Sequence, residues 1–261
     1  HTANRRQRQM CIRDRVWPVA FEEAKVMKLK AFILFLLATF HFESATLKEL
    51  KEKENVFEAG LLLSGLDNGI HFLEPENDMQ RHLLLGIHGG GSLGYEWVYP
   101  LSTLDSPSNL VTYFKWSPLV LNCLAEDTEF LIDFLETQGQ SYETITILGH
   151  SLGGVLLGKV LESVNTNIPI MAHIIASPLA GIAPANQICE YQPPKAIKEN
   201  IELYEWRTIK RLDGVFLALP FDPQVVDIQG SIATRLPETY KENKLGHNWS
   251  ISWVADEISK R

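Results

Sequence analysis

Short segments that are apolar throughout alternate with helical patterns along most of the chain. The expected strands cover residues 83–87, 110–116, 145–148, 170–176, 201–209 and 232–236. Apolar residues recur at helical spacing over 122–137, 152–164 and 249–258. A strand that is apolar at every position, rather than at every second one, is buried on both faces. The pattern therefore predicts an α/β fold, with an open, mostly parallel central sheet and helices on both faces.

The composition excludes several other classes of protein. With 45% apolar and 21% charged residues, and no internal repeat, the chain is typical of a globular protein and not of a disordered or fibrous one. The net charge of −8, from 24 basic and 32 acidic residues, disfavours a nucleic-acid partner. The three cysteines match no zinc spacing, so no structural metal is expected.

The first 45 residues are expected to lie outside the folded domain. Residues 1–26 show no apolar period, and we expect a disordered leader or one foreign to the natural protein. Residues 27–45 combine a short cationic start with the apolar run Ala31–Phe40, which is typical of a signal peptide; a buried helix or an uncleaved membrane anchor is the alternative. We therefore expect a secreted or periplasmic protein, or a cytoplasmic one if this segment is no signal. Residues 46–261 are expected to form a single domain.

The motif Gly149-His150-Ser151-Leu152-Gly153 follows one expected strand and opens an expected helix. A serine that stands out from a sheet on such a sharp turn needs glycines two residues before and after it, since a Cβ there would collide with the strand or the helix. An ordinary glycine-rich turn is the alternative. The position predicts that Ser151 is a nucleophile and that His150 is structural.

A second glycine-rich loop, His88-Gly89-Gly90-Gly91, follows the expected strand at 83–87. Glycines allow backbone N–H groups to approach a reacting carbonyl oxygen closely. A flexible turn would have the same composition. Together with the serine motif, the loop predicts an oxyanion hole formed by the N–H groups of Gly89, Gly90 and Leu152.

The combination of His-Gly-Gly-Gly, Gly-His-Ser-Leu-Gly-Gly and a late Gly-His resembles the α/β-hydrolase superfamily, especially its lipase and esterase branch. The turn Ala176–Gly181, after the strand that follows the serine motif, is also similar to one found in many lipases. The resemblance spans roughly residues 80 to 255 and implies the α/β-hydrolase fold. Because this fold hosts many reactions, the resemblance implies little about the substrate.

The superfamily's order of catalytic residues is serine, acid and then histidine. Among the eight histidines, only His247 comes late enough in the chain to be the base. Asp213, in an Asp-Gly turn, is the expected acid; Asp222 and Asp227 are the second and third candidates. The resemblance thus implies a triad of Ser151, Asp213 and His247.

Three aromatic residues follow the glycine-rich loop at a spacing of two, which is typical of one face of an extended segment. Tyr95 and Trp97, with Tyr99, are expected to line a substrate pocket, although core positions would give the same pattern. Between the strands ending near residue 176 and beginning near 201 there is little room for a cap domain. We therefore expect an open site with little or no cap.

These features predict a serine hydrolase that cleaves carboxylic esters through an acyl-enzyme, without a cofactor. The expected partner is a small-molecule or lipid ester, with transient contact to a membrane or lipid interface; the oligomeric state is left open. A thioesterase, an amidase, an acyltransferase and a non-catalytic binding protein of the same fold are the alternatives. Cys123 and Cys189 would pair in an exported protein, or remain free buried thiols.

Overall fold

The structure is a computed structural model, and it describes residues 45–118, 123–183 and 185–260. All of these residues lie in one compact unit. The expected leader at 1–26 and nearly all of the expected signal peptide at 27–45 lie outside the described residues. No helix within the described ranges is long and apolar enough to cross a membrane.

The described residues form a seven-stranded sheet in the order β1-β3-β2-β4-β5-β6-β7. The strands are β1 (Gly69–Phe72), β2 (His82–Ile87), β3 (Asn109–Lys115), β4 (Thr144–His150), β5 (Ile170–Ile175), β6 (Ile201–Arg207) and β7 (Ile232–Arg235). Every neighbouring pair is parallel except β1 and β3. A separate hairpin joins β8 (Thr239–Tyr240) to β9 (Asn243–Lys244). The prediction of a mostly parallel central sheet is confirmed.

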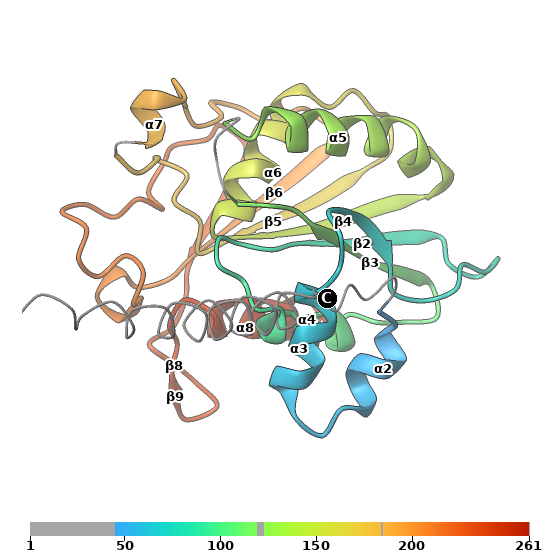
Figure 1. Cartoon of the computed structure of the whole chain (residues 1–261). Coiled ribbons are helices and arrows are strands. Elements are labelled where there is room, and N and C mark those ends of the chain that lie inside the picture. Colours follow the sequence, from blue (N-terminus) through green and yellow to red (C-terminus); the bar gives the residue numbers. More distant parts are fainter. Residues whose placement is uncertain (1–44, 119–122, 184, 261) are drawn as a thin grey trace, which may run out of the picture. The chain divides into compact units, whose positions relative to one another are not determined.

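Helices cover both faces of this sheet (Figure 1). One face carries α5 (Ala125–Glu136) and α6 (Leu152–Ser163). The other carries α2 (Leu47–Glu52), α3 (Val56–Ser64), α4 (Tyr95–Thr103) and α8 (Trp249–Ile258). The other helical segments among the described residues are the short α7 (Ala185–Ile188) and the single 3-10 turns η1 (Gln138–Ser141) and η2 (Lys210–Leu212).

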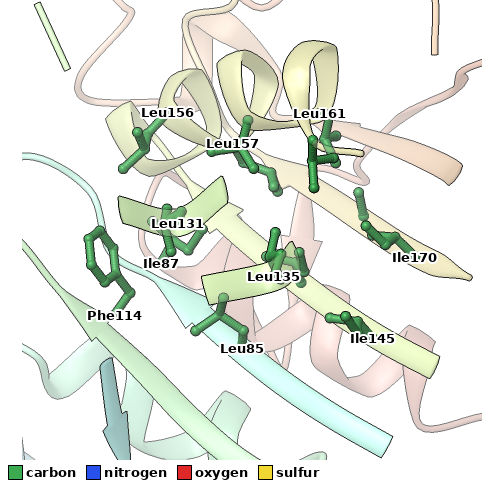
Figure 2. Packing of buried hydrophobic residues seen from close by; sticks show 14 of the residues in the cluster. Leu85, Ile87, Phe114, Leu131, Leu135, Ile145, Leu156, Leu157, Leu161 and Ile170 are labelled. Carbon is green, nitrogen blue, oxygen red and sulfur yellow. The ribbon is translucent and has the colours of Figure 1, made fainter. Parts of the chain in front are cut away.

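Successive side chains of a central strand point into two apolar cores, one on each face of the sheet. The strand β2 shows that such a strand has to be apolar at every position. Leu83, Leu85 and Ile87 pack with α5 and α6, while Leu84 packs in the core under α4 and α8. All four are buried. Figure 2 shows the first core, where leucines of α5 and α6 meet Leu85 and other strand residues.

The extended segment expected for the three aromatic residues is wrong: Tyr95, Trp97 and Tyr99 lie on the helix α4. Gly94, with φ 82°, precedes the helix. Trp97 and Leu101 then point into the core at helical spacing, so burial against α8 and the sheet decides the conformation over aromatic strand preference. The strand β1 and the helix α3 had no counterpart among the expected elements.

The described residues of the connection from β5 to β6, 176–183 and 185–200, contain no element other than α7, which agrees with the expectation of little or no cap. A disulfide joins Cys123 to Cys189 in this connection, with a Cα–Cα distance of 5.3 Å. Of the two states left open for these cysteines, the structure has the paired one.

Candidate active site

Ser151 lies on a sharp turn between β4 and α6. Its backbone has φ 54° and ψ −122°. For a residue other than glycine, this conformation is unfavourable by about 1–3 kcal/mol. The Ser151 N–H donates to the carbonyl of Ile175 at 2.9 Å, which holds the turn against the end of β5. Such strain is retained where the surrounding structure enforces it, here at the candidate nucleophile.

The two glycines of the motif allow the chain to pass through this turn. A Cβ on Gly149 would lie 2.7 Å from the carbonyl oxygen of Gly153. A Cβ on Gly153 would lie 2.5 Å from the carbonyl oxygen of Ile87, at the end of β2. Both contacts are shorter than a carbon atom tolerates, so the strand-to-helix turn requires glycine at both positions.

His88 orients the glycine-rich loop. Its Nδ1–H donates to the Gly89 carbonyl at 2.8 Å, and its Nε2 accepts from the Trp116 N–H at 3.2 Å. Burial lowers the pKa of His88 to about 4, so the ring is neutral and this tautomer satisfies both contacts. In a trans peptide the N–H points opposite to the carbonyl, so His88 also fixes the direction of the Gly90 N–H.

The loop lies directly against the candidate nucleophile. A Cβ on Gly89 would be 2.7 Å from the Ser151 Cβ, and one on Gly90 would be 2.9 Å from the Leu152 Cδ1. Leu152 is the first residue of α6, so its N–H has no acceptor within the helix. The three residues expected to form an oxyanion hole are therefore brought together around Ser151.

Asp213 and His247 form a hydrogen-bonded pair, with 2.9 Å between His247 Nδ1 and Asp213 Oδ2. His247 lies in the loop between β9 and α8, while Asp213 follows η2 beyond the end of β6. Because the carboxylate accepts from Nδ1–H, the Nε2 of a neutral His247 carries a free lone pair. That nitrogen is the one a general base needs.

The environment of Asp213 keeps it ionised. Burial raises the pKa of this carboxyl, but hydrogen bonds from His247, Thr208 and the Val215 N–H, with the charge of His247, lower it below its ordinary value. The Thr208 hydroxyl donates at 2.6 Å and the Val215 N–H at 2.9 Å. A fully buried carboxylate with this many donors can hold a neighbouring imidazole in one orientation.

Two rings hold His247 in place. Phe216 meets it edge-on with centroids 5.1 Å apart, and His150 lies at 4.6 Å. The His150 Nε2–H also donates to the His247 carbonyl at 3.2 Å. Burial and the neighbouring His247 lower the pKa of His150 well below its ordinary value, so it is neutral. These contacts agree with the structural role expected for His150.

The two other candidate acids lie elsewhere. Asp222 pairs with Arg235 at 2.8 Å and accepts from Gln224. Asp227 is exposed. Among the described residues, neither has a hydrogen bond to His247, and Asp213 alone of the three is placed beside it.

Most of the expected site residues line one pocket of about 450 Å³. These are Gly89, Gly90, Tyr95, Ser151, Leu152 and His247. Sequence reasoning missed other lining residues, namely Gly91, Ser92, Leu93, Glu96, Pro178, Ile182, Val215, Phe216 and Asn248. Several of these residues are close in sequence to a motif. Val215, Phe216 and Asn248 could have been predicted to line the pocket because they closely follow Asp213 or His247 in the chain.

Two of the three aromatic residues are not part of this pocket, which corrects the expectation for Trp97. Trp97 is fully buried beneath Gly86 and packs on Tyr113, because the helical twist of α4 turns it into the core. Tyr99 is exposed and donates to Asp256 on α8 at 2.6 Å. Tyr95 does line the pocket and accepts from the Asn248 side chain at 2.8 Å.

The described residues contain no group of three or more histidine, cysteine or acidic side chains that could hold a metal ion. The side chains that are present offer a nucleophile, a base and an acid beside backbone donors. The strand order, the strained serine turn after β4 and the positions of Asp213 and His247 are those of an α/β-hydrolase fold.

Solved structures with a similar fold include several esterases. A lipase-esterase related protein from Clostridium acetobutylicum has 12% identity and a TM-score of 0.44, over 73% of this chain and 97% of that one. An esterase from Exiguobacterium antarcticum has 12% identity and a TM-score of 0.44, over 74% and 96%. The esterase domain of a Rhodothermus marinus protein has 15% identity and a TM-score of 0.43, over 73% and 89%.

No family model matches the chain, and no curated protein matches its sequence. The similarity to solved structures is one of fold, and the substrate has to be argued from the site itself.

Proposed function

We propose that the protein is a serine hydrolase that cleaves carboxylic esters through an acyl-enzyme. The observation that carries this proposal is the hydrogen bond between Asp213 and His247 at the pocket where Ser151 stands on its strained turn. The pocket also contains the backbone of the glycine-rich loop, so a nucleophile, a base and donors for an oxyanion share one space.

In the first half of the reaction, the His247 Nε2 accepts the proton of the Ser151 hydroxyl as its oxygen attacks the ester carbonyl. Asp213 stabilises the resulting imidazolium through Nδ1–H. The N–H groups of Gly89, Gly90 and Leu152 donate to the oxyanion, and each such donor lowers the barrier by roughly 3–4 kcal/mol in comparable sites.

In the second half, His247 gives its proton to the departing alkoxide, and the alcohol leaves. Water then enters and loses a proton to the His247 Nε2 as it attacks the acyl-enzyme. Collapse of the second tetrahedral intermediate breaks the bond to the Ser151 oxygen, which regains its proton from His247. The acid is released and the resting side chains are restored.

The test compares hydrolysis of p-nitrophenyl acetate by the wild type, Ser151→Ala and Ser177→Ala. Ser177 directly follows β5, is buried, and its hydroxyl has no hydrogen-bond partner among the described residues. We expect Ser151→Ala to lose at least about a thousandfold in kcat/KM, whereas Ser177→Ala keeps the wild-type rate. Turnover that survives Ser151→Ala in a folded protein would overturn the proposal.

Thioesters, amides and competing alcohol acceptors, assayed beside the oxygen ester, separate the thioesterase, amidase and acyltransferase alternatives.

We further propose export, which the disulfide between Cys123 and Cys189 supports because such bonds persist in oxidising compartments. Expression from Met27 in a bacterium, followed by intact mass of the periplasmic protein, tests this. A protein that keeps residues 27–45 would contradict a cleaved signal peptide.

A further inference from the structure

A second pocket, almost entirely apolar, adjoins the pocket of Ser151. Three residues line both pockets: Leu152, Pro178 and Ile182. The second pocket is narrow, with a volume of about 80 Å³. A substrate chain that extends from Ser151 past Leu152 therefore meets apolar side chains, in a pocket that is half open to solvent.

The helix α6 gives this pocket its direction and length. Leu152, Val155 and Lys159 all line it, and their spacing of three and then four residues places them on one face of the helix. A helix rises 1.5 Å per residue, so the eight residue-to-residue steps from Ser151 to Lys159 span about 12 Å. The pocket thus leads away from the nucleophile along α6.

The other walls come from distant parts of the chain. The disulfide Cys123–Cys189 forms one of them, and Ala185 of α7 another (α6 and α7 are labelled in Figure 1). The far end is polar: Lys159, Cys189 and Tyr191 also line a third pocket, which is mostly polar. An apolar chain longer than the second pocket would therefore extend into polar surroundings.

We infer that this second pocket is an acyl subsite that takes a linear, apolar acyl chain of medium length, an inference that rests on the proposed ester hydrolase. An extended chain of about eight to ten carbons spans 12 Å, since each C–C bond is about 1.5 Å long and the chain is a zigzag. The pocket is narrow and half open, so a linear chain can lie along it with one side in solvent, whereas a bulky chain does not fit between its walls. Each methylene that moves from water into an apolar pocket strengthens binding by up to about fourfold.

The wild type should therefore hydrolyse p-nitrophenyl octanoate with a kcat/KM at least about tenfold above that for acetate. Chains beyond about ten carbons should gain no more, because their ends pass Lys159. The 5,5-dimethylhexanoate ester has the same number of carbons as octanoate, with its branch remote from the carbonyl. It should be about tenfold slower than octanoate, because its bulky end does not fit the narrow pocket.

A matched pair of variants tests the location. Ala185→Trp places an indole at the pocket from an exposed position, whereas Ala183→Trp makes the same change two residues away, at an exposed residue that lines neither pocket. We expect Ala185→Trp to lower the ratio of octanoate to acetate kcat/KM by about tenfold, and Ala183→Trp to leave it unchanged. Val155→Phe, which fills the pocket from α6, should lower the ratio in the same way.

An unchanged ratio in folded Ala185→Trp, or an equal change in Ala183→Trp, would overturn the subsite. If the wild type hydrolyses acetate through Ser151 but shows no preference between acetate and octanoate, the subsite fails and the proposed function stands. If no ester is hydrolysed in a Ser151-dependent way, the proposed function fails and the subsite fails with it.

Discussion

At the scale of single residues, the candidate site depends on few atoms with strict positions. His247 is useful as a base only in the tautomer with its proton on Nδ1, and the 2.9 Å contact to Asp213 selects that tautomer. Thr208 and the Val215 N–H occupy other acceptor positions of the same carboxylate, so its orientation is fixed in turn. Rotation of Asp213 would cost these hydrogen bonds as well.

Asp213→Asn should therefore lower kcat by about a thousandfold or more, because an amide nitrogen cannot accept from Nδ1–H and the imidazole takes the wrong tautomer. Asp222→Asn is the matched control: it removes a partly exposed ion pair with Arg235 and should leave kcat within about twofold. Steady-state kinetics of the two variants, with circular dichroism to verify folding, make the comparison. A larger loss in Asp222→Asn would reassign the acid.

The residues that meet at the candidate site could be predicted where a motif or the chain order specifies them, and not where packing places them. Ser151 was proposed from its glycines and His247 from its place in the chain order, both of which are written in the sequence. Trp97 was wrongly expected in the substrate pocket, because the direction of its side chain depends on whether the chain around it is extended or helical. Packing of α4 against α8 in the core favours the helix, and no local sequence pattern reveals that packing.

At the scale of elements, the parallel strands were the predictable part of the fold. Their uniform apolarity follows from burial on both faces, so β2 to β6 were found within a few residues of their bounds. The edge strand β1 was missed because it is short and half exposed. The paired state of Cys123 and Cys189 could not be chosen either, because their separation of 66 positions in the sequence says nothing about their distance in space.

The disulfide ties the β5–β6 connection to the segment before α5, and we expect it to stabilise the fold. Closing a loop of 66 residues lowers the entropy of the unfolded chain by an amount equivalent to about 4 kcal/mol, which is an upper value for the effect. The double variant Cys123→Ala/Cys189→Ala should unfold at a lower urea concentration than the oxidised wild type. Reductant should shift the wild type to the same midpoint and leave the variant unmoved. Equal midpoints for oxidised wild type and variant would contradict a stabilising bond.

At the scale of the whole molecule, buried neutral histidines couple stability to pH. Burial lowers the pKa of His88 to about 4 and that of His150 well below its ordinary value. As the pH falls below about 6.5, the unfolded chain binds protons that the folded chain refuses, so acid destabilises the fold. For His88 this loss ends near pH 4, where the folded form also takes up the proton.

The free energy of unfolding should accordingly fall by about 2 to 3 kcal/mol between pH 7.5 and 4.5 through His88 alone. The lowered pKa of His150 decreases the free energy of unfolding further as the pH falls. His88→Phe keeps an aromatic ring beside Tyr113 and Trp116 but cannot titrate, so its stability should depend less on pH. Urea titrations at both pH values measure the difference. The same pH dependence in wild type and variant would refute the role given to His88.

The central claim is that Ser151 is a nucleophile activated by His247 and Asp213, and covalent labelling tests it most directly. The wild type and Ser151→Ala are incubated with an alkyl fluorophosphonate, and intact mass and peptide mapping locate the adduct. We predict one phosphonyl group on Ser151 in the wild type and none in the variant. A folded wild type that remains unlabelled, or a label carried by a different residue, would contradict the account.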